Sequence, residues 1–104
     1  MPPFPKPLPE GWFLSDNEEA AVRHEELQKE LPEGHLLYRT PVAVVARREG
    51  TDDILCHHER DWDRFTVIHL SWIGRTEINA EHPTVEVDGD FDAFLEYESA
   101  FGRT

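Results

Sequence analysis

The sequence predicts an α+β domain with a three- to four-stranded antiparallel meander sheet and an N-terminal and a C-terminal helix packed against it. Segments with helical periodicity stand near both ends, whereas the segments between them are β-branched or alternate in polarity. The turns between these central segments are short, which favours antiparallel neighbours because a parallel pair needs a long crossover. A chain of 104 residues supplies one modest core, so residues 15–104 are expected to form a single domain.

Residues 1–14 precede this domain and are expected to form a proline-rich extended arm. Five of the first nine residues are proline. Proline fixes φ and lacks an amide donor, so this density excludes a helix and favours polyproline II. Apolar side chains interleave the prolines, which predicts that the arm lies on its own domain; docking into an aromatic-lined groove of another protein is the alternative. These apolar residues are Phe4, Leu8, Trp12 and Phe13.

The first helix is expected to begin at the segment Ser15-Asp16-Asn17-Glu18, which has the S-x-x-E form of a capping box. It should run to about Leu31, because Pro32-Glu33-Gly34 supplies a stop. One narrow apolar stripe recurs at steps of four, three and four residues, so one face of the helix is expected to be buried. The stripe consists of Ala20, His24, Leu27 and Leu31.

The central segments are predicted to be strands of one sheet. The first is followed by the turn Glu49-Gly50-Thr51-Asp52, and a charged loop at 59–64 joins the second to the third, which ends at Gly74. The last is a short, alternating segment that follows Pro83 and suits an edge position. These segments are 42–46, 53–58, 65–73 and 84–87.

The C-terminal helix is expected after the turn Asp88-Gly89-Asp90. Its apolar residues fall on one side, and its acidic residues fall mostly on the other, where they would meet solvent. The apolar set is Phe91, Phe94, Leu95 and Phe101, and the acidic set is Asp92, Glu96 and Glu98.

Alternation along the strands predicts one apolar face and one semi-polar face of the sheet. Ile68, Leu70 and Trp72 are expected to join Ile54 and Cys56 beneath the helices. The opposite face would be open and would meet solvent, the arm, a second copy or a partner. It would carry Leu55, His57, Val67, His69 and Ser71, together with Val44, Ala46 and Arg48 if the turn loop has an even number of residues.

The charge balance restricts the partners that the chain is expected to have. There are 22 acidic against 10 basic residues, a formal charge of −12. Nucleic-acid binding relies on Lys and Arg, so a basic protein is the easier match and nucleic acid is not expected. No apolar run has the length of a membrane span or a signal peptide. We therefore expect no membrane association. The lone Cys56 cannot form an internal disulfide, which favours a cytoplasmic location.

Candidate chemistry is confined to the strands. No nucleophile elbow, phosphate-binding loop or zinc-protease motif is present, and we expect neither a cofactor nor a metal. The best acid–base constellation is His69 next to Arg48, Asp53 or Ser71. A metal at His57 with His69 is the alternative, on the condition that the strand register places them opposite each other.

Three stretches resemble a pattern found in small bacterial proteins of uncharacterised function. They are Ala46-Arg47-Arg48, Asp52-Asp53-Ile54-Leu55-Cys56 and Val67-Ile68-His69-Leu70-Ser71-Trp72, against A-R-R, D-D-V-L-F and V-V-H-L-T-W. The resemblance spans roughly residues 24 to 95, and the chain departs from it with Cys56 in place of an aromatic residue and Ser71 in place of threonine. It implies a bacterial, cytoplasmic, single-domain protein and carries no particular activity. It draws attention to Arg48, Asp53, His69 and Trp72 as a cluster at one end of the second and third strands.

Two functional interpretations follow. The first is a non-enzymatic acidic domain that binds a protein partner or a second copy of itself, with Arg48, Asp53, His69 and Trp72 as candidate binding residues. Neutralisation of a basic toxin by an immunity-like protein is one concrete form. The second is a small hydrolase or a ligand- or metal-binding enzyme that uses His69 with Arg48 and Asp53, with a metal at His57 as an option.

Overall fold

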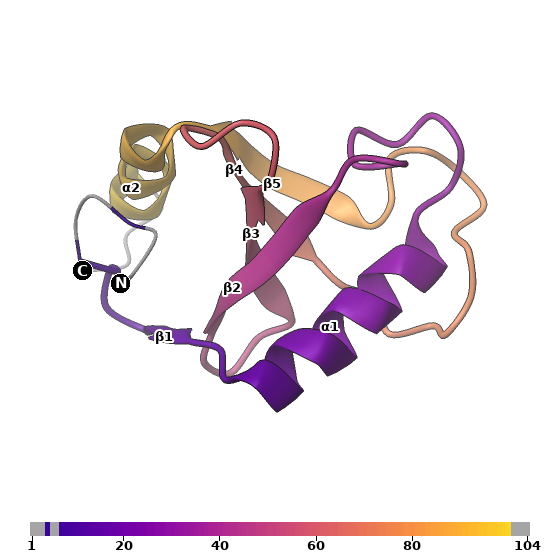
Figure 1. The fold of residues 1–104 in the computed structure, drawn as a ribbon, viewed down its shortest axis with the longest axis horizontal. Coiled ribbons are helices and arrows are strands. Elements are labelled where there is room, and N and C mark those ends of the chain that lie inside the picture. The colour runs from indigo at the N-terminus through magenta and orange to yellow at the C-terminus, as the bar shows by residue number, and fades with distance from the viewer. Residues whose placement is uncertain (1–3, 5–6, 101–104) are drawn as a thin grey trace.

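The computed structural model describes residue 4 and residues 7–100, so Phe101 of the predicted apolar set lies outside the described residues. Within these residues five strands and two helices follow one another along the chain (Figure 1). They are β1 (Trp12–Leu14), α1 (Asn17–Glu30), β2 (Val42–Arg48), β3 (Asp53–His58), β4 (Phe65–His69), β5 (Thr84–Gly89) and α2 (Phe91–Ala100).

The strands form one sheet in the order β1-β2-β3-β4-β5, and every neighbouring pair is antiparallel. The predicted α+β class and the antiparallel meander are therefore confirmed, but the sheet has five strands rather than three or four. The additional strand is β1, which falls in the predicted arm and pairs with Ala46 to Arg48 of β2. At three residues, β1 is too short to show an alternation of its own. Phe4 and Leu8, upstream of β1, pack against the core.

The start of α1 lies one residue later than predicted. The N-cap is Asp16, whose carboxylate accepts a hydrogen bond from the Glu19 amide at 2.8 Å, and the Glu19 carboxylate accepts from the Asp16 amide at 3.3 Å. Ser15 instead donates its amide to the carbonyl of Val45. The capping box is thus real but is built from an aspartate, which caps as well as serine does.

The two helices cover opposite faces of the sheet, with α1 on one side and α2 on the other (Figure 1). The predicted open, semi-polar face is therefore wrong, because α2 buries it. Alternation separated the two faces of β3 and β4 correctly but carries no information on which face a helix takes. The α1 core contains Leu27, Leu31, Leu37, Val42, Val44, Ile54, Cys56, Ile68 and Leu70, and the α2 core contains Trp12, Ala46, Leu55, Phe65, Val67, Phe91 and Phe94.

A bulge divides β2. Val44 lies opposite Cys56, but the next pair is Ala46 opposite Leu55, so one extra residue stands on the β2 side. Val44 consequently faces α1, whereas Ala46 and Arg48 face α2. The expectation that Val44, Ala46 and Arg48 share a face is wrong for this reason.

β4 ends at His69 and does not continue to residue 73 as predicted. Trp72 adopts a left-handed backbone with φ of 57° and is 42% exposed, so it does not join the core. The buried carboxylate of Glu30 accepts hydrogen bonds from the amides of Ser71 at 3.0 Å and Trp72 at 2.7 Å. Glu26 accepts the amide of Gly74 at 2.9 Å. Carboxylates of α1 therefore draw the chain out of the sheet after β4.

Glu26 and Glu30 are buried side by side on α1. Burial, reinforced by the hydrogen bond that Glu30 donates to the Glu26 carboxylate, raises the pKa of Glu30. The same hydrogen bond lowers the pKa of Glu26. Because two carboxylates this close interact strongly, Glu30 is the member of the pair that takes up a proton first as the pH falls.

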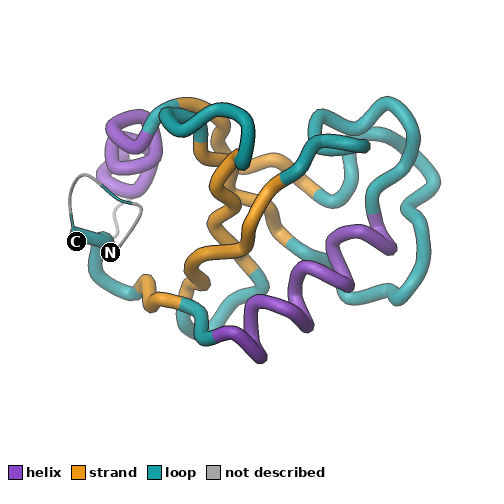
Figure 2. The backbone as a smooth tube through the Cα atoms, viewed as in Figure 1, coloured by secondary structure: helices purple, strands orange, loops and turns teal. Residues whose placement is uncertain are grey.

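The loops after α1 and after β4 pack together at one end of the molecule (Figure 2). His35 accepts the Leu37 amide at Nδ1, which leaves Nε2 to donate to the Pro83 carbonyl at 2.6 Å.

Neither helix of the described residues has the length and apolar character to cross a bilayer. Cys56 is fully buried in β3, and burial raises the pKa of its thiol to about 12.

Replacing Leu27 by alanine should lower the free energy of unfolding by about 2–5 kcal/mol, because the side chain is fully buried and its loss leaves a cavity. Val22→Ala on the same helix should change it by less than about 0.5 kcal/mol, since Val22 is 56% exposed. Urea denaturation of both variants measures the difference. Equal effects would show that α1 does not pack through Leu27.

Candidate functional site

A buried ion network surrounds Arg48 between the sheet and α2. Its Nε donates to Asp53 Oδ2 at 3.0 Å, its Nη1 donates to Glu98 Oε1 at 2.8 Å, and its Nη2 donates to Glu98 Oε2. The guanidinium carbon lies 4.9 Å from the centre of the Trp12 ring. Each of the three guanidinium nitrogens thus donates to a carboxylate of the chain itself, beside an aromatic ring.

His69 joins this network at the surface. The β3–β4 register places it opposite Asp53, and its Nδ1 lies 2.7 Å from Asp53 Oδ1. The hydrogen bond to Asp53 raises the pKa of His69, and partial burial opposes it. The side chain is half exposed. With Nδ1 engaged by Asp53, Nε2 is the nitrogen left to exchange a proton with another molecule.

The structure brings three of the four predicted site residues together. Arg48, Asp53 and His69 form one chain of hydrogen bonds. Trp72 lies beside this chain: its Nε1 donates to Oδ1 of Asp52 at 3.0 Å rather than to Asp53. The predicted cluster is thus a triad of residues with Trp72 at its margin.

Sequence reasoning missed Glu98 and Trp12 as members of the network. Glu98 was expected to face solvent, but it is 2% exposed and forms two of the hydrogen bonds to Arg48. The spacing of Phe91, Phe94 and Glu98, at steps of three and four, is the signal that places Glu98 on the buried face of α2. Trp12 carried no comparable signal, because it lies in the segment taken for an arm.

The register does not place His57 opposite His69. His57 pairs with Phe65, whereas His69 pairs with Asp53 at the other end of the two strands. The His57 ring stacks on Phe65 with the centroids 4.6 Å apart, and its Nε2 lies 3.0 Å from the Trp62 carbonyl oxygen. Residues 4 and 7–100 contain no group of three or more His, Cys, Asp or Glu side chains arranged to hold a metal ion. The condition for a shared metal at His57 and His69 is therefore not met.

An exposed tryptophan stands in the loop between β3 and β4, residues 59–64, which we call the acidic turn. Trp62 is 71% exposed, and its ring meets the edge of His57 at 4.9 Å. The amides of Arg64 and Asp63 donate to the carbonyl and the carboxylate of Asp61, which fixes the turn. Arg64 is itself paired with Asp88 at 2.8 Å. The turn also carries Glu59, Arg60, Asp61 and Asp63, so carboxylates flank Trp62.

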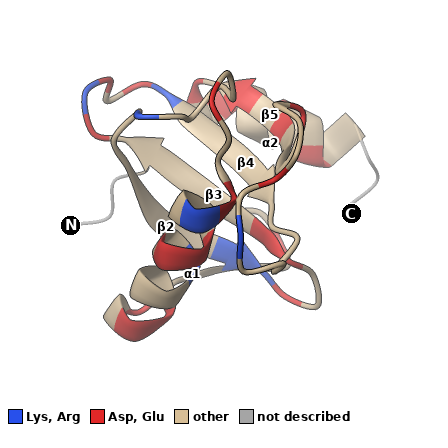
Figure 3. Cartoon of the chain, turned by 90° about the vertical axis from the view of Figure 1, so that its right-hand side faces the viewer, with Lys and Arg blue, Asp and Glu red and all other residues tan. Residues whose placement is uncertain are grey.

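Charge is distributed unevenly over the rest of the surface, and Figure 3 shows acidic residues along both helices and in several loops. Arg47 pairs with Glu19 at 3.2 Å, with both side chains partly exposed. Arg47, Arg48 and Arg64 each form an ion pair with a carboxylate of the chain itself. The acidic turn keeps exposed carboxylates next to an aromatic side chain.

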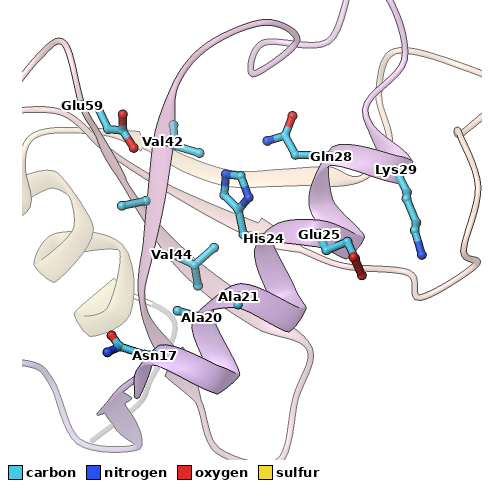
Figure 4. Close-up of a pocket in the computed structure, with 11 residues that line it drawn as sticks. Asn17, Ala20, Ala21, His24, Glu25, Gln28, Lys29, Val42, Val44 and Glu59 are labelled. Atoms are coloured by element: carbon cyan, nitrogen blue, oxygen red, sulfur yellow. The ribbon is translucent and has the colours of Figure 1, made fainter.

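A groove runs between α1 and β2, and we call it the α1–β2 groove. Its volume is about 880 Å³, and Figure 4 shows His24 standing between the helix and the strand. Sequence reasoning placed His24 in the buried stripe of α1 and so missed the groove. The lining residues are Asn17, Ala20, Ala21, His24, Glu25, Gln28 and Lys29 from α1, Val42, Ala43 and Val44 from β2, and Glu59 from the acidic turn.

No protein-family model, curated protein or solved structure matched the chain. The resemblance to small bacterial proteins thus stays a prediction.

Asp53→Asn should lower the pKa of His69, because it removes the carboxylate that holds the charged imidazole. The raised pKa in the folded state means that this ion pair stabilises the fold below the unfolded histidine pKa of about 6.5 and is lost as the pH rises through the folded value. Titration of the His69 ring by NMR measures the shift. Asp63→Asn, which removes one carboxylate in the acidic turn, should leave it unchanged.

Arg48→Met should lower the free energy of unfolding by about 3–5 kcal/mol, because Asp53 and Glu98 are left buried without their cation. Arg47→Met, at the adjacent position, breaks only a partly exposed pair with Glu19 and should cost about 1 kcal/mol or less. Thermal and urea denaturation of both variants test this contrast. Equal small effects would mean that the buried network does not hold α2 on the sheet.

Proposed function

We propose that this chain is a non-enzymatic cytoplasmic domain that binds a basic protein partner. The observation that carries the proposal is Trp62, a 71% exposed indole held in a well-braced turn and flanked by carboxylates. Trp is enriched among the residues that dominate binding energy at protein interfaces. Neutralisation of a basic toxin is one form that such binding takes.

The chemistry of the acidic turn favours Lys and Arg on the partner. A cation over an indole ring gains stabilisation from the ring quadrupole, and the carboxylates of Asp61 and Asp63 add charge pairing around it. The overall charge of −12 steers a basic protein towards the domain and speeds its association. The turn is fixed by its own hydrogen bonds, so little ordering remains to be lost on binding.

The ion network around Arg48 supports the non-enzymatic interpretation. Each nitrogen of the guanidinium donates a hydrogen bond to a carboxylate of the chain itself. Arg48, Asp53 and Glu98 are all buried. A substrate would have to displace these bonds to reach them, which leaves a buried charge unpaired and costs several kcal/mol. The network is best understood as the attachment of α2 to the sheet.

Trp62→Ala should weaken binding of the partner by about tenfold or more, because it removes the aromatic anchor. A tagged wild-type chain recovers the partner from its host, and calorimetry with the purified partner then measures the affinity of each variant. Val22→Ala, which truncates another exposed apolar residue, is the control and should bind as the wild type does.

Two double variants distinguish the contribution of the acidic turn to binding from that of the net charge. Asp61→Asn with Asp63→Asn should slow association and reduce its salt dependence, whereas Glu18→Gln with Glu96→Gln makes the same change of charge on the helices and should have a smaller effect. Recovery of no partner at low salt, or full binding by the Trp62→Ala variant, would contradict the proposal.

A second candidate function is favoured by one observation. Asp53 orients His69 through Nδ1 while half of the side chain is exposed, which is the arrangement of a general base with its orienting carboxylate. Such a pair can activate water for the hydrolysis of an ester. This candidate uses Asp53 and His69 as predicted from the sequence, with Arg48 as the residue that holds Asp53 in place.

His69→Ala should abolish hydrolysis of p-nitrophenyl acetate under this second candidate. The rate should rise with pH as His69 loses its proton, and it should do so above the usual histidine range because the His69 pKa is raised. His82→Ala, at an exposed histidine outside the network, is the matched control. Equal hydrolysis by the wild type and the His69→Ala variant removes the candidate.

A further inference from the structure

Half of the outer edge of β2 has no strand beside it in the part of the chain that the structure describes. β1 pairs with Ala46, Arg47 and Arg48, and its last residue, Leu14, lies opposite Ala46. Ser15 then donates to the Val45 carbonyl, and the chain turns into α1. The edge formed by residues 42–44 borders the α1–β2 groove instead.

The backbone of this half-edge points into the groove. The Glu59 amide donates to the Pro41 carbonyl at 3.0 Å, so this pair is hydrogen-bonded across β2 and β3. Hydrogen-bonded and non-hydrogen-bonded pairs alternate along an antiparallel ladder. Ala43 therefore bonds β3, whereas the amide and carbonyl groups of Val42 and Val44 are directed away from β3. An unpaired edge of this kind is a template for another extended backbone.

The groove is preformed around this edge. The side chains of Val42 and Val44 are anchored in the α1 core, which holds the strand rigid. On the α1 side, the groove is lined by the short side chains of Ala20 and Ala21 and then by His24 and Gln28 (Figure 4). A strand edge beside a helix, with about 880 Å³ between them, is the geometry in which peptides add to a sheet.

We propose that an extended segment of the basic partner adds to the free edge of β2 as a further strand within the α1–β2 groove. The inference rests on the proposed function and names how the partner binds. Glu25 and Glu59 line the groove against Lys29, so its carboxylates outnumber its cations. Glu59 is also the first residue of the acidic turn, which makes the groove and that surface continuous. A segment with Lys or Arg at alternate positions matches both the edge and the charge.

The test uses a library of random ten-residue peptides selected on the wild-type chain. We expect enriched peptides to be extended, rich in Lys and Arg, and to slow hydrogen exchange of the Val42 and Val44 amides by tenfold or more. N-methylation of the peptide residues that face β2 should abolish binding, because it removes the donors that pair with the edge.

A matched pair of variants locates the site. Ala21→Trp places an indole in the groove and should abolish binding of the selected peptides, whereas Val22→Trp adds the same bulk at an exposed neighbouring position that does not line the groove. Absence of enriched peptides, equal binding by the two variants, or unchanged exchange at Val42 and Val44 would overturn the proposal. A concentration-dependent dimer that buries the same edge would also overturn it in favour of a second copy.

The outcomes separate this inference from the proposed function. Peptides that occupy the groove without a preference for Lys and Arg would support strand addition and count against a basic partner. A partner that requires Trp62 but binds the Ala21→Trp variant normally would support the interaction domain and overturn strand addition.

Discussion

In β2 one extra residue between Val44 and Ala46 divides the strand into halves that serve opposite faces of the sheet. The first half packs beneath α1, and the second carries Arg48 to the side where Glu98 of α2 reaches it. Without the extra residue the guanidinium would lie in the α1 core, where burial of a charge far from its carboxylates is prohibitive. Pairing with β1 stops at the same bulge, where the chain turns into α1, and the free edge beside the groove begins there.

The acidity of the chain has two structural roles. Glu26, Glu30, Asp53 and Glu98 are buried, and they hold the segment after β4 and the helix α2 in place. These carboxylates belong to the interior and are not offered to a partner. The carboxylates of the acidic turn are exposed next to an aromatic ring, and they are the ones whose chemistry favours a basic protein. Net charge alone does not distinguish the two groups, because it takes no account of burial.

The class, the order of elements from α1 onwards and the meander were predictable from the sequence, because periodicity and short turns report them locally. The triad of Arg48, Asp53 and His69 was predictable as well, since the hairpin turn and strand alternation bring these positions to one end of the sheet. The bulge was not, because no local pattern in the apolar run marks an extra residue. The exit of the chain after His69 depends on Glu30, which lies 41 residues from Ser71, and strand propensity carries no trace of it.

The burial of Cys56 has a practical consequence for measuring how this sheet opens. The thiol is fully buried on a central strand, and it stays protonated well above neutral pH. A thiol reagent therefore reaches it only after the core between α1 and the sheet has opened. When reclosing is faster than the reaction, the labelling rate divided by that of a free thiol gives the free energy of this opening, from a native residue and without an introduced probe.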